Sequence, residues 1–276
     1  MFTISLLLLS VVPQVFGCAD HQNFMRPGHN EKRQMNISNT GRTPTYWAYE
    51  ASFNWGKLSP DYHLCQDGTQ QSPIALGLNQ GLSLYHQPDF SGYPSEVLGN
   101  YYNWGYGPAF TFYREPGNYT SLPYMTVDGE RMYMTGWHIH SPADHTVGGD
   151  RSKAEIHYVH YTADGHERAV VAIRLDPGRE DSPFFAQFPP AIHFNDTSAI
   201  QNLDMDPMQA IREVSNFSEF WTYKGSLTSP PCKEGLQWFL ARNILFTSRI
   251  QMQDILGAST FSARAEQEVW GHEVNV

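Results

Sequence analysis

The sequence has little positive charge. Its 276 residues include 18 Lys and Arg against 28 Asp and Glu, which gives a formal net charge of −10. A protein that binds nucleic acids in general needs a dense basic surface for the phosphate backbone. No cluster of Lys or Arg in this sequence is dense enough. The charge therefore excludes a general nucleic-acid binder, and the acidity predicts only a solvated surface.

Long apolar runs are also missing. The apolar run within residues 1–17 is too short to cross a bilayer, and no later segment is long and apolar enough. The run ends in Val15-Phe16-Gly17, an acceptable small-residue context for cleavage. We therefore predict a signal peptide over residues 1–17 and a secreted, extracellular protein without a membrane span. The usual basic start of a signal peptide is absent, so an uncleaved anchor is the alternative.

Cysteine is scarce, with three residues in the chain. Cys65 and Cys232 could close a long loop in an oxidising compartment, whereas Cys18 lies in the predicted cleavage zone and is either lost or left unpaired. Four N-x-[ST] sequons are candidates for glycosylation in the same compartment: Asn36, Asn118, Asn195 and Asn216.

Helical periodicity is rare, while aromatic residues, Gly and Pro are abundant. This composition favours strands joined by turns. Only residues 206–214 predict a helix, because Asp206 can cap it and Pro207 occupies the first helical position. Short β-like runs predict strands at residues 109–113, 124–129, 131–140, 154–161, 169–175, 235–241 and 243–246.

The chain shows no internal repeat and one change of composition. Residues 18–45 are polar and have no apolar period, which predicts a flexible N-terminal extension. Short strands and turns continue from there to the end. We therefore predict a single, mainly β (α+β) domain over residues 46–276, with short peripheral helices.

Histidines on two neighbouring predicted strands form a candidate metal site. Residues i and i+2 of a strand share a face, so His138 and His140 project together. A turn at residues 146–152 can bring His157 beside them, which completes the three protein ligands usual for catalytic zinc. Glu155 shares the face of His157 and can accept a ring N–H from a ligand histidine.

Metal binding is not the only interpretation of these histidines. An H-x-H pair alone is more often a surface or core feature than a metal site. The partner strand at residues 154–161 is what favours zinc. We expect His145 and His160 to be structural histidines of the core, not ligands.

The same residues belong to a longer pattern. The segments "WHIHSPADHTV" and "AEIHYVHY" resemble the α-class carbonic anhydrases of the secreted, eukaryotic type, and the similarity continues through residues 47–50, 53–76, 103–110, 169–175 and 220–240. The resemblance implies one domain on a large, twisted, mostly antiparallel central sheet, with zinc at the base of a cleft. By position it implies His138, His140 and His157 as ligands, and a disulfide between Cys65 and Cys232.

The resemblance also implies an activity, the reversible hydration of CO₂ to bicarbonate and a proton. In carbonic anhydrases themselves, zinc held by three histidines lowers the pKa of its water to about 7, and the resulting hydroxide attacks CO₂. Thr228 matches the threonine that orients this hydroxide and donates its own proton to a carboxylate. Aromatic sulfonamides and anions are the expected inhibitors. Residues that match the CO₂ pocket are Val159, Val170, Leu227, Trp238 and, as a neighbouring hydroxyl, Ser229.

Three positions depart from the usual family pattern. Asp144 replaces the glutamate that pairs with the threonine, and its reach is shorter by about 1.5 Å, one C–C bond. Gly136 replaces a glutamine that supports the first ligand. Tyr106 stands at the proton-shuttle position, where an ordinary tyrosine pKa near 10 makes a poor relay at neutral pH.

These departures leave alternatives to an efficient enzyme. The chain could be a catalytically weakened extracellular binding or matrix protein that keeps the fold, or a zinc esterase. For the four apolar pocket residues, ordinary core packing is the simpler interpretation. The sequence predicts neither an oligomeric state nor a physiological role.

Overall fold

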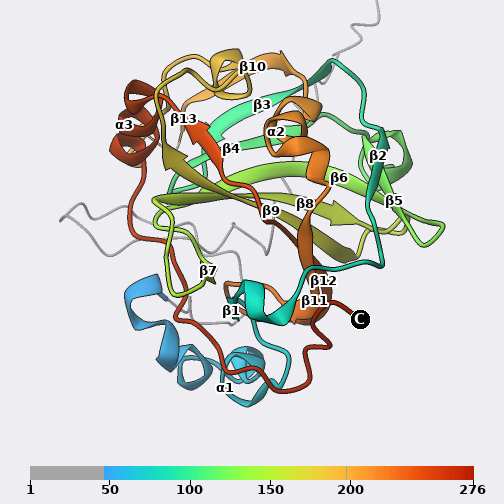
Figure 1. The fold of residues 1–276 in the computed structure, drawn as a ribbon. Helices are drawn as coiled ribbons and strands as arrows, with labels where there is room; N and C mark the ends of the chain where they lie inside the picture. The colour runs from blue at the N-terminus through green and yellow to red at the C-terminus, as the bar shows by residue number, and fades with distance from the viewer. Residues whose placement is uncertain (1–46, 197) are drawn as a thin grey trace, which may run out of the picture.

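The structure is a computed structural model that describes residues 47–196 and 198–276 (Figure 1). The predicted signal peptide and N-terminal extension, with Cys18 and Asn36, lie outside the described residues. No helix among the described residues is long and apolar enough to span a membrane.

A large twisted sheet runs through the centre of the molecule (Figure 1). Its main path is β10-β3-β4-β6-β8-β9-β12-β11, with β13 beside β9, β5 beside β6 and β2 beside β5. Neighbours are antiparallel except that β12 and β13 run parallel to β9. The eleven strands are β2 (Asp89–Gly92), β3 (Val97–Asn103), β4 (Pro108–Phe112), β5 (Tyr124–Val127), β6 (Glu130–His140), β8 (Ala154–Tyr161), β9 (Glu167–Pro177), β10 (Ile200–Met205), β11 (Phe220–Ser226), β12 (Glu234–Ala241) and β13 (Leu245–Thr247).

This architecture confirms the predicted fold class. All seven predicted strands are present, as β4, β5, β6, β8, β9, β12 and β13. The sequence did not predict β2, β3, β10 or β11. It also missed β1 (Ala75–Leu76) and β7 (Thr146–Val147), which pair in parallel apart from the large sheet.

Helices are short and peripheral. The predicted helix is α2 (Met208–Glu213), and the Met208 N–H donates to Asp206 Oδ1 at 2.8 Å, as expected of a cap. The sequence missed α3 (Arg249–Ala258), whose first turn has a capping box between Ser248 and Gln251. The third α-helix, α1 (Leu64–Asp67), lies at the opposite end of the molecule from α2 and α3 (Figure 1).

The two faces of the sheet bury different side chains. On β6, Trp137 and Ile139 face the large apolar core, so His138 and His140 must face the other side. Burying each large apolar side chain contributes about 1.5–3 kcal/mol. A one-residue slip of the strand would exchange the two faces and place the histidines in the apolar core. Burial of Trp137 and Ile139 thus sets the direction of the histidines.

A disulfide joins the first described elements to a late part of the chain. Cys65 of α1 is bonded to Cys232, which precedes β12, at a sequence separation of 167 residues. In the chain-entropy account, closing a loop of this length stabilises the fold by about 5 kcal/mol. This is the pairing that the family resemblance implies, and it ties α1 to the loop that carries Thr228.

Candidate metal centre

Three buried histidines converge at the middle of the sheet. The β6–β8 register places His138 directly opposite His157, and His140 follows two residues later on β6. The Nε2 atoms of His138 and His140 are 2.9 Å apart, and one nitrogen from each of the three rings lies within 4.8 Å of the others. His138 is 8% exposed, His140 1% and His157 2%. The structure therefore brings the three predicted ligands to one point.

Two of these rings are oriented by bonds on their far side. His140 Nδ1 lies 2.7 Å from the Ser262 carbonyl oxygen, and His157 Nε2 lies 2.7 Å from Glu155 Oε1. A neutral imidazole that donates from one nitrogen has a lone pair on the other. Burial lowers the pKa of His140, which favours this neutral form. His140 thus presents Nε2 to the centre and His157 presents Nδ1.

The donor set fits a zinc ion. Zinc accepts neutral imidazole nitrogens and favours a tetrahedral arrangement at 2.0–2.1 Å, which separates two ligand nitrogens by about 3.3 Å. The separation of 2.9 Å between the Nε2 atoms of His138 and His140 needs only a small ring rotation to match this spacing. Carboxylate or carbonyl bonds on the far nitrogens are the usual support of zinc histidines.

Glu155 is the centre of a buried polar network behind His157. Its Oε1 accepts from His157 and from His145 Nδ1, at 2.7 and 2.6 Å, and its Oε2 accepts from the His145 backbone N–H at 3.0 Å. His145 Nε2 lies 2.7 Å from the Tyr223 hydroxyl, which donates to Ser72 Oγ. Burial alone would raise the pKa of Glu155, but the contacts with His145 and His157 outweigh burial and hold that pKa well below its ordinary value.

The C-terminal segment supplies two groups that the sequence did not reveal. Besides the Ser262 carbonyl at His140, the Arg264 backbone N–H donates to Asp144 Oδ1 at 2.8 Å. The Arg264 guanidinium is buried and donates to the Ser72 carbonyl at 2.7 Å, and burial lowers its pKa to about 10. These residues lie about 120 positions from their partners and belong to no local pattern, so no sequence signal could have identified them.

Comparisons with known proteins now bear on this geometry. A family model described as eukaryotic-type carbonic anhydrase matches residues 50–271. The chain belongs to this family. Relatives and fold together identify it as a carbonic anhydrase and support CO₂ hydration as its general chemistry.

Individual relatives and solved structures show the extent of the similarity. Alpha carbonic anhydrase 4 of Arabidopsis thaliana is 31% identical over 201 residues, which is 73% of this chain and 70% of that one. A solved complex of the α-carbonic anhydrase from Thermovibrio ammonificans with the inhibitor sulfanilamide has a TM-score of 0.70 and 27% identity, over 83% of this chain and 98% of that one. The structure of dioscorin complexed with ascorbate has a TM-score of 0.61 and 26% identity, over 81% of this chain and 92% of that one.

Asp144 does not reach the threonine with which a carbonic anhydrase glutamate is expected to pair. No hydrogen bond joins the buried side chains of Asp144 and Thr228, two residues that the structure describes fully. Asp144 Oδ2 lies 3.6 Å from His140 Nδ1 and has no hydrogen-bond partner within the described part of the chain. The shorter side chain therefore ends at the Arg264 backbone.

The absence of a side chain at position 136 has a steric explanation in this carbonic anhydrase. A Cβ at this position would lie 2.0 Å from the Phe110 carbonyl oxygen of the neighbouring strand β4. Such a contact is far inside van der Waals distance, so no side chain fits without a shift of the backbone. Support for His138 therefore cannot come from residue 136.

Tyr106 occupies a different environment from that of a proton shuttle. Its side chain is 4% exposed and packs against Tyr49 and Trp104, with ring centroids 5.0 Å away in both cases. A shuttle has to exchange protons with solvent, and an enclosed phenol is poorly placed for that task. The geometry gives the predicted shuttle position no support.

The predicted CO₂-pocket residues are distributed over two buried clusters. Val170, Leu227 and Trp238 share one cluster, and Val159 lies in another with Tyr161. The Trp238 ring centroid is 5.0 Å from that of His157, which places the cluster beside the metal centre. Ser229 is half-buried after Thr228.

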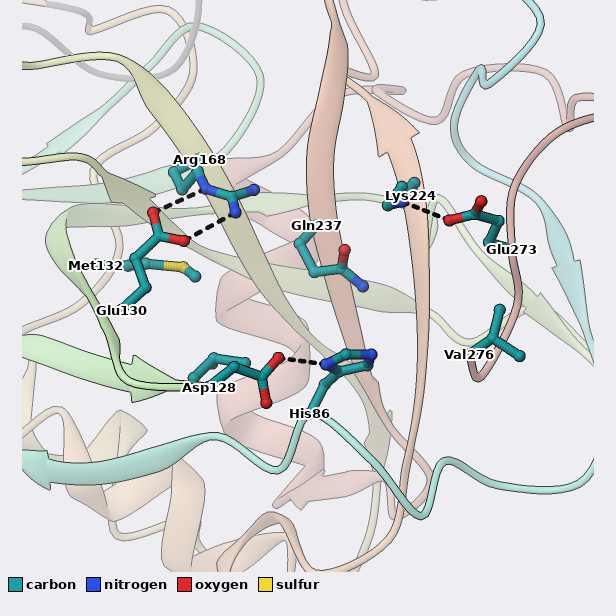
Figure 2. Close-up of a pocket in the computed structure, with 10 residues that line it drawn as sticks. His86, Asp128, Glu130, Met132, Arg168, Lys224, Gln237, Glu273 and Val276 are labelled. Carbon is teal, nitrogen blue, oxygen red and sulfur yellow. Dashed lines mark hydrogen bonds and ion pairs between the residues drawn. The ribbon is translucent and has the colours of Figure 1, made fainter.

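Three sequon asparagines and a cavity lined by other residues complete the description. Asn118, Asn195 and Asn216 are exposed, as an acceptor of a glycan must be. A cavity of about 590 Å³ is lined by ten other residues, among them β11 and β12 side chains (Figure 2). Its ionisable side chains contact one another in three pairs, which are His86–Asp128, Arg168–Glu130 and Lys224–Glu273.

Proposed function

We propose that this carbonic anhydrase is a secreted zinc enzyme that reversibly hydrates CO₂ to bicarbonate and a proton. The observation that carries the proposal is the convergence of His138, His140 and His157, with two of the rings oriented from behind. When bound, zinc would supply a coordinated water whose pKa is about 7 in carbonic anhydrases, and so a nucleophile at neutral pH.

The remaining residues hold and orient the reactants in this proposal. Glu155 and Ser262 keep the ligand nitrogens of His157 and His140 aimed at the centre. Thr228 orients the nucleophile, and Asp144 is its intended acceptor. Because no direct bond joins these two side chains, orientation is weaker and turnover slower than with a glutamate. Uncharged CO₂ is held by the apolar wall and its adjacent hydroxyl, formed by Val159, Val170, Leu227, Trp238 and Ser229.

Secretion is part of the same proposal. A disulfide between Cys65 and Cys232 is typical of an oxidising compartment, and the asparagines of three sequons are exposed. The predicted signal peptide would deliver the chain there. Digestion of the secreted protein with a glycosidase and N-terminal sequencing would test both the glycans and the cleavage.

Metal content and CO₂ hydration test the activity. The secreted protein is assayed for bound zinc and by stopped-flow CO₂ hydration, before and after treatment with a chelator. We expect about one zinc per chain, hydration above the buffer rate, loss of hydration on chelation and recovery with added zinc. A zinc-loaded sample no faster than buffer would overturn the proposal.

The second candidate is an extracellular binding protein with weakened catalysis, favoured by the missing hydrogen bond between Asp144 and Thr228. Dioscorin, which has this fold, has been solved with ascorbate. Titration with an aromatic sulfonamide separates the two candidates, because its anionic nitrogen binds an open zinc. Zinc and tight sulfonamide binding without CO₂ hydration would favour the binding protein.

A further inference from the structure

We infer that Trp104 is a positioning residue for the metal centre, because it fixes the β6 backbone between His138 and His140. Its indole Nε1–H donates to the carbonyl oxygen of Ile139, the residue between the two histidines, at 3.1 Å. Its ring centroid lies 5.1 Å from that of His138 and 5.3 Å from that of His140, edge to face in both cases. The inference rests on the proposed zinc site.

The Ile139 carbonyl needs this donor because of the sheet register. Ala109 of β4 lies opposite His138 of β6, so the next pair along the ladder is Pro108 and Ile139. Proline has no N–H and cannot donate to the ladder. An unpaired buried carbonyl is as unfavourable as a lost hydrogen bond, and Ile139 is fully buried. The indole of Trp104 replaces the ladder donor that Pro108 lacks.

The turn between β3 and β4 is shaped to deliver the indole. The Trp104 backbone N–H donates to the Gly107 carbonyl at 3.1 Å, which folds the four residues 104–107 into a tight turn. A Cβ on Gly107 would lie 2.8 Å from the Ile139 oxygen. That oxygen therefore faces the β4 side of the strand, and glycine at 107 keeps the approach to it open.

The ring contacts matter because one family support is missing. Residue 136 has no room for a side chain beside the Phe110 carbonyl, so it cannot brace His138. The Trp104 ring lies against both β6 imidazoles, and a rotation of either ring toward it would displace the indole. Trp104 is 6% exposed and is enclosed by Tyr49 and Tyr106, so it cannot yield easily.

Two substitutions separate the hydrogen bond from the ring contact. Trp104→Phe keeps an aromatic ring but loses the Nε1–H, and Trp104→Ala loses both. Residues that orient metal ligands typically change metal affinity by about 10–100-fold when removed. We expect zinc to bind about 10–100-fold more weakly to W104A, and several-fold more weakly, by roughly 3–10-fold, to W104F.

Trp55 offers a matched control in the same aromatic cluster. Its Nε1–H also donates to a carbonyl, that of Ala48 at 2.9 Å, and its ring contacts Trp47, Tyr49 and the Arg264 guanidinium, whereas no ring contact with a β6 histidine is present. Trp55→Phe should lower the melting temperature and leave zinc affinity within about twofold, since the change lies outside the ligand support.

The measurements are zinc affinity by competition with a chromophoric chelator and the visible absorption of the cobalt-substituted protein, which reports ligand geometry. Altered cobalt spectra and weaker zinc binding in both Trp104 variants, with W55F unchanged, support the inference. Equal zinc affinity and spectra in W104A and the unchanged protein overturn it, and so does an equal loss in W55F and W104F. If the unchanged protein itself binds no zinc, the proposed function fails as well.

Discussion

Two buried histidines three residues apart on β8 have opposite environments. His157 is held at Nε2 by the Glu155 carboxylate, which leaves Nδ1 directed toward His138 and His140. His160 faces the other side, where its Nδ1 lies 3.1 Å from the Tyr158 carbonyl and its Nε2 lies 2.5 Å from the Tyr93 hydroxyl. Burial alone does not make a ligand. A ligand keeps one nitrogen free of the protein and aimed at its fellow ligands.

The charges differ in the same way. Burial lowers the pKa of His160 to about 3, so this ring stays neutral between two neutral partners. Glu155 stays ionised behind His157, because its histidine contacts hold its pKa well below the ordinary value despite burial. His160 thus has two neutral partners, whereas His157 has an anionic carboxylate behind it, as suits its proposed role as a metal ligand.

Substituting His157 and His160 in turn should give the largest difference in zinc affinity and CO₂ hydration. His157→Ala removes one of three metal donors, so zinc affinity should fall by more than the 10–100-fold typical of outer partners, and CO₂ hydration should fall to the buffer rate. His160→Gln should retain zinc and activity. Both are measured by chelator competition and stopped flow. Unchanged zinc affinity in H157A would remove His157 from the ligand set.

Neutralising the support behind His157 should have the next largest effect. Glu155→Gln keeps the size of the side chain but removes the carboxylate, and we expect zinc to bind about 10–100-fold more weakly. Glu213→Gln is a matched control, because Glu213 accepts a bond from the Phe184 backbone far from any ligand. Equal zinc affinity in E155Q and E213Q would contradict the role of Glu155.

The buried, neutral His160 should make the free energy of unfolding depend on pH. The folded-state pKa of His160, about 3, lies below the unfolded value near 6.5, so its contribution is complete above pH 6.5 and is lost as pH falls toward 3. Between pH 7 and 5 the unchanged protein should lose about 2 kcal/mol more free energy of unfolding than H160Q. Urea denaturation with chelator present, which removes zinc release from the comparison, measures the difference. Parallel pH profiles for the two proteins would show that His160 does not titrate in this way.

The smallest expected effect is a gain in kcat from lengthening the side chain of Asp144. Asp144→Glu adds the methylene that would let the carboxylate reach Thr228. One further hydrogen bond of about 0.5–1.5 kcal/mol in the transition state would raise kcat roughly 2–10-fold. The gain should vanish in a Thr228→Val background and leave zinc affinity unchanged. A gain that persists without the Thr228 hydroxyl would assign it to another cause.

Local patterns account for what the sequence predicted. His138, His140 and His157 lie on adjacent antiparallel strands, and the connection between them, residues 141–153, contains recognisable turn residues, so strand periodicity and the turn suffice to predict that they meet. The missed strands lack such patterns. β10 is a largely exposed edge strand in which half of the residues are polar, and β3 contains Gly99 and two asparagines, which are poor strand formers. The capping box at Ser248 was visible in the sequence, so α3 could have been predicted.

Groups that contact the predicted ligands or Asp144 but lie far from them along the sequence could not be predicted in this way. Ser262 and Arg264 reach His140 and Asp144 only because the C-terminal segment runs beside the end of β6, where Phe261 pairs with Ser141. The role of Trp104 depends on which residue faces Pro108 across the sheet, and the sequence does not state that register. The enclosure of Tyr106 likewise results from packing among distant rings.

The distance along the chain between ligands and supports has a consequence for protein synthesis. A ribosome that has just added Tyr161 has made all three proposed zinc ligands and Glu155. The Ser262 carbonyl, which orients His140, is made about a hundred residues later, after Thr228 and Cys232. A nascent chain therefore contains the three proposed ligands and Glu155 well before it contains the carbonyl that orients His140, so in our proposal the support of the site is completed late.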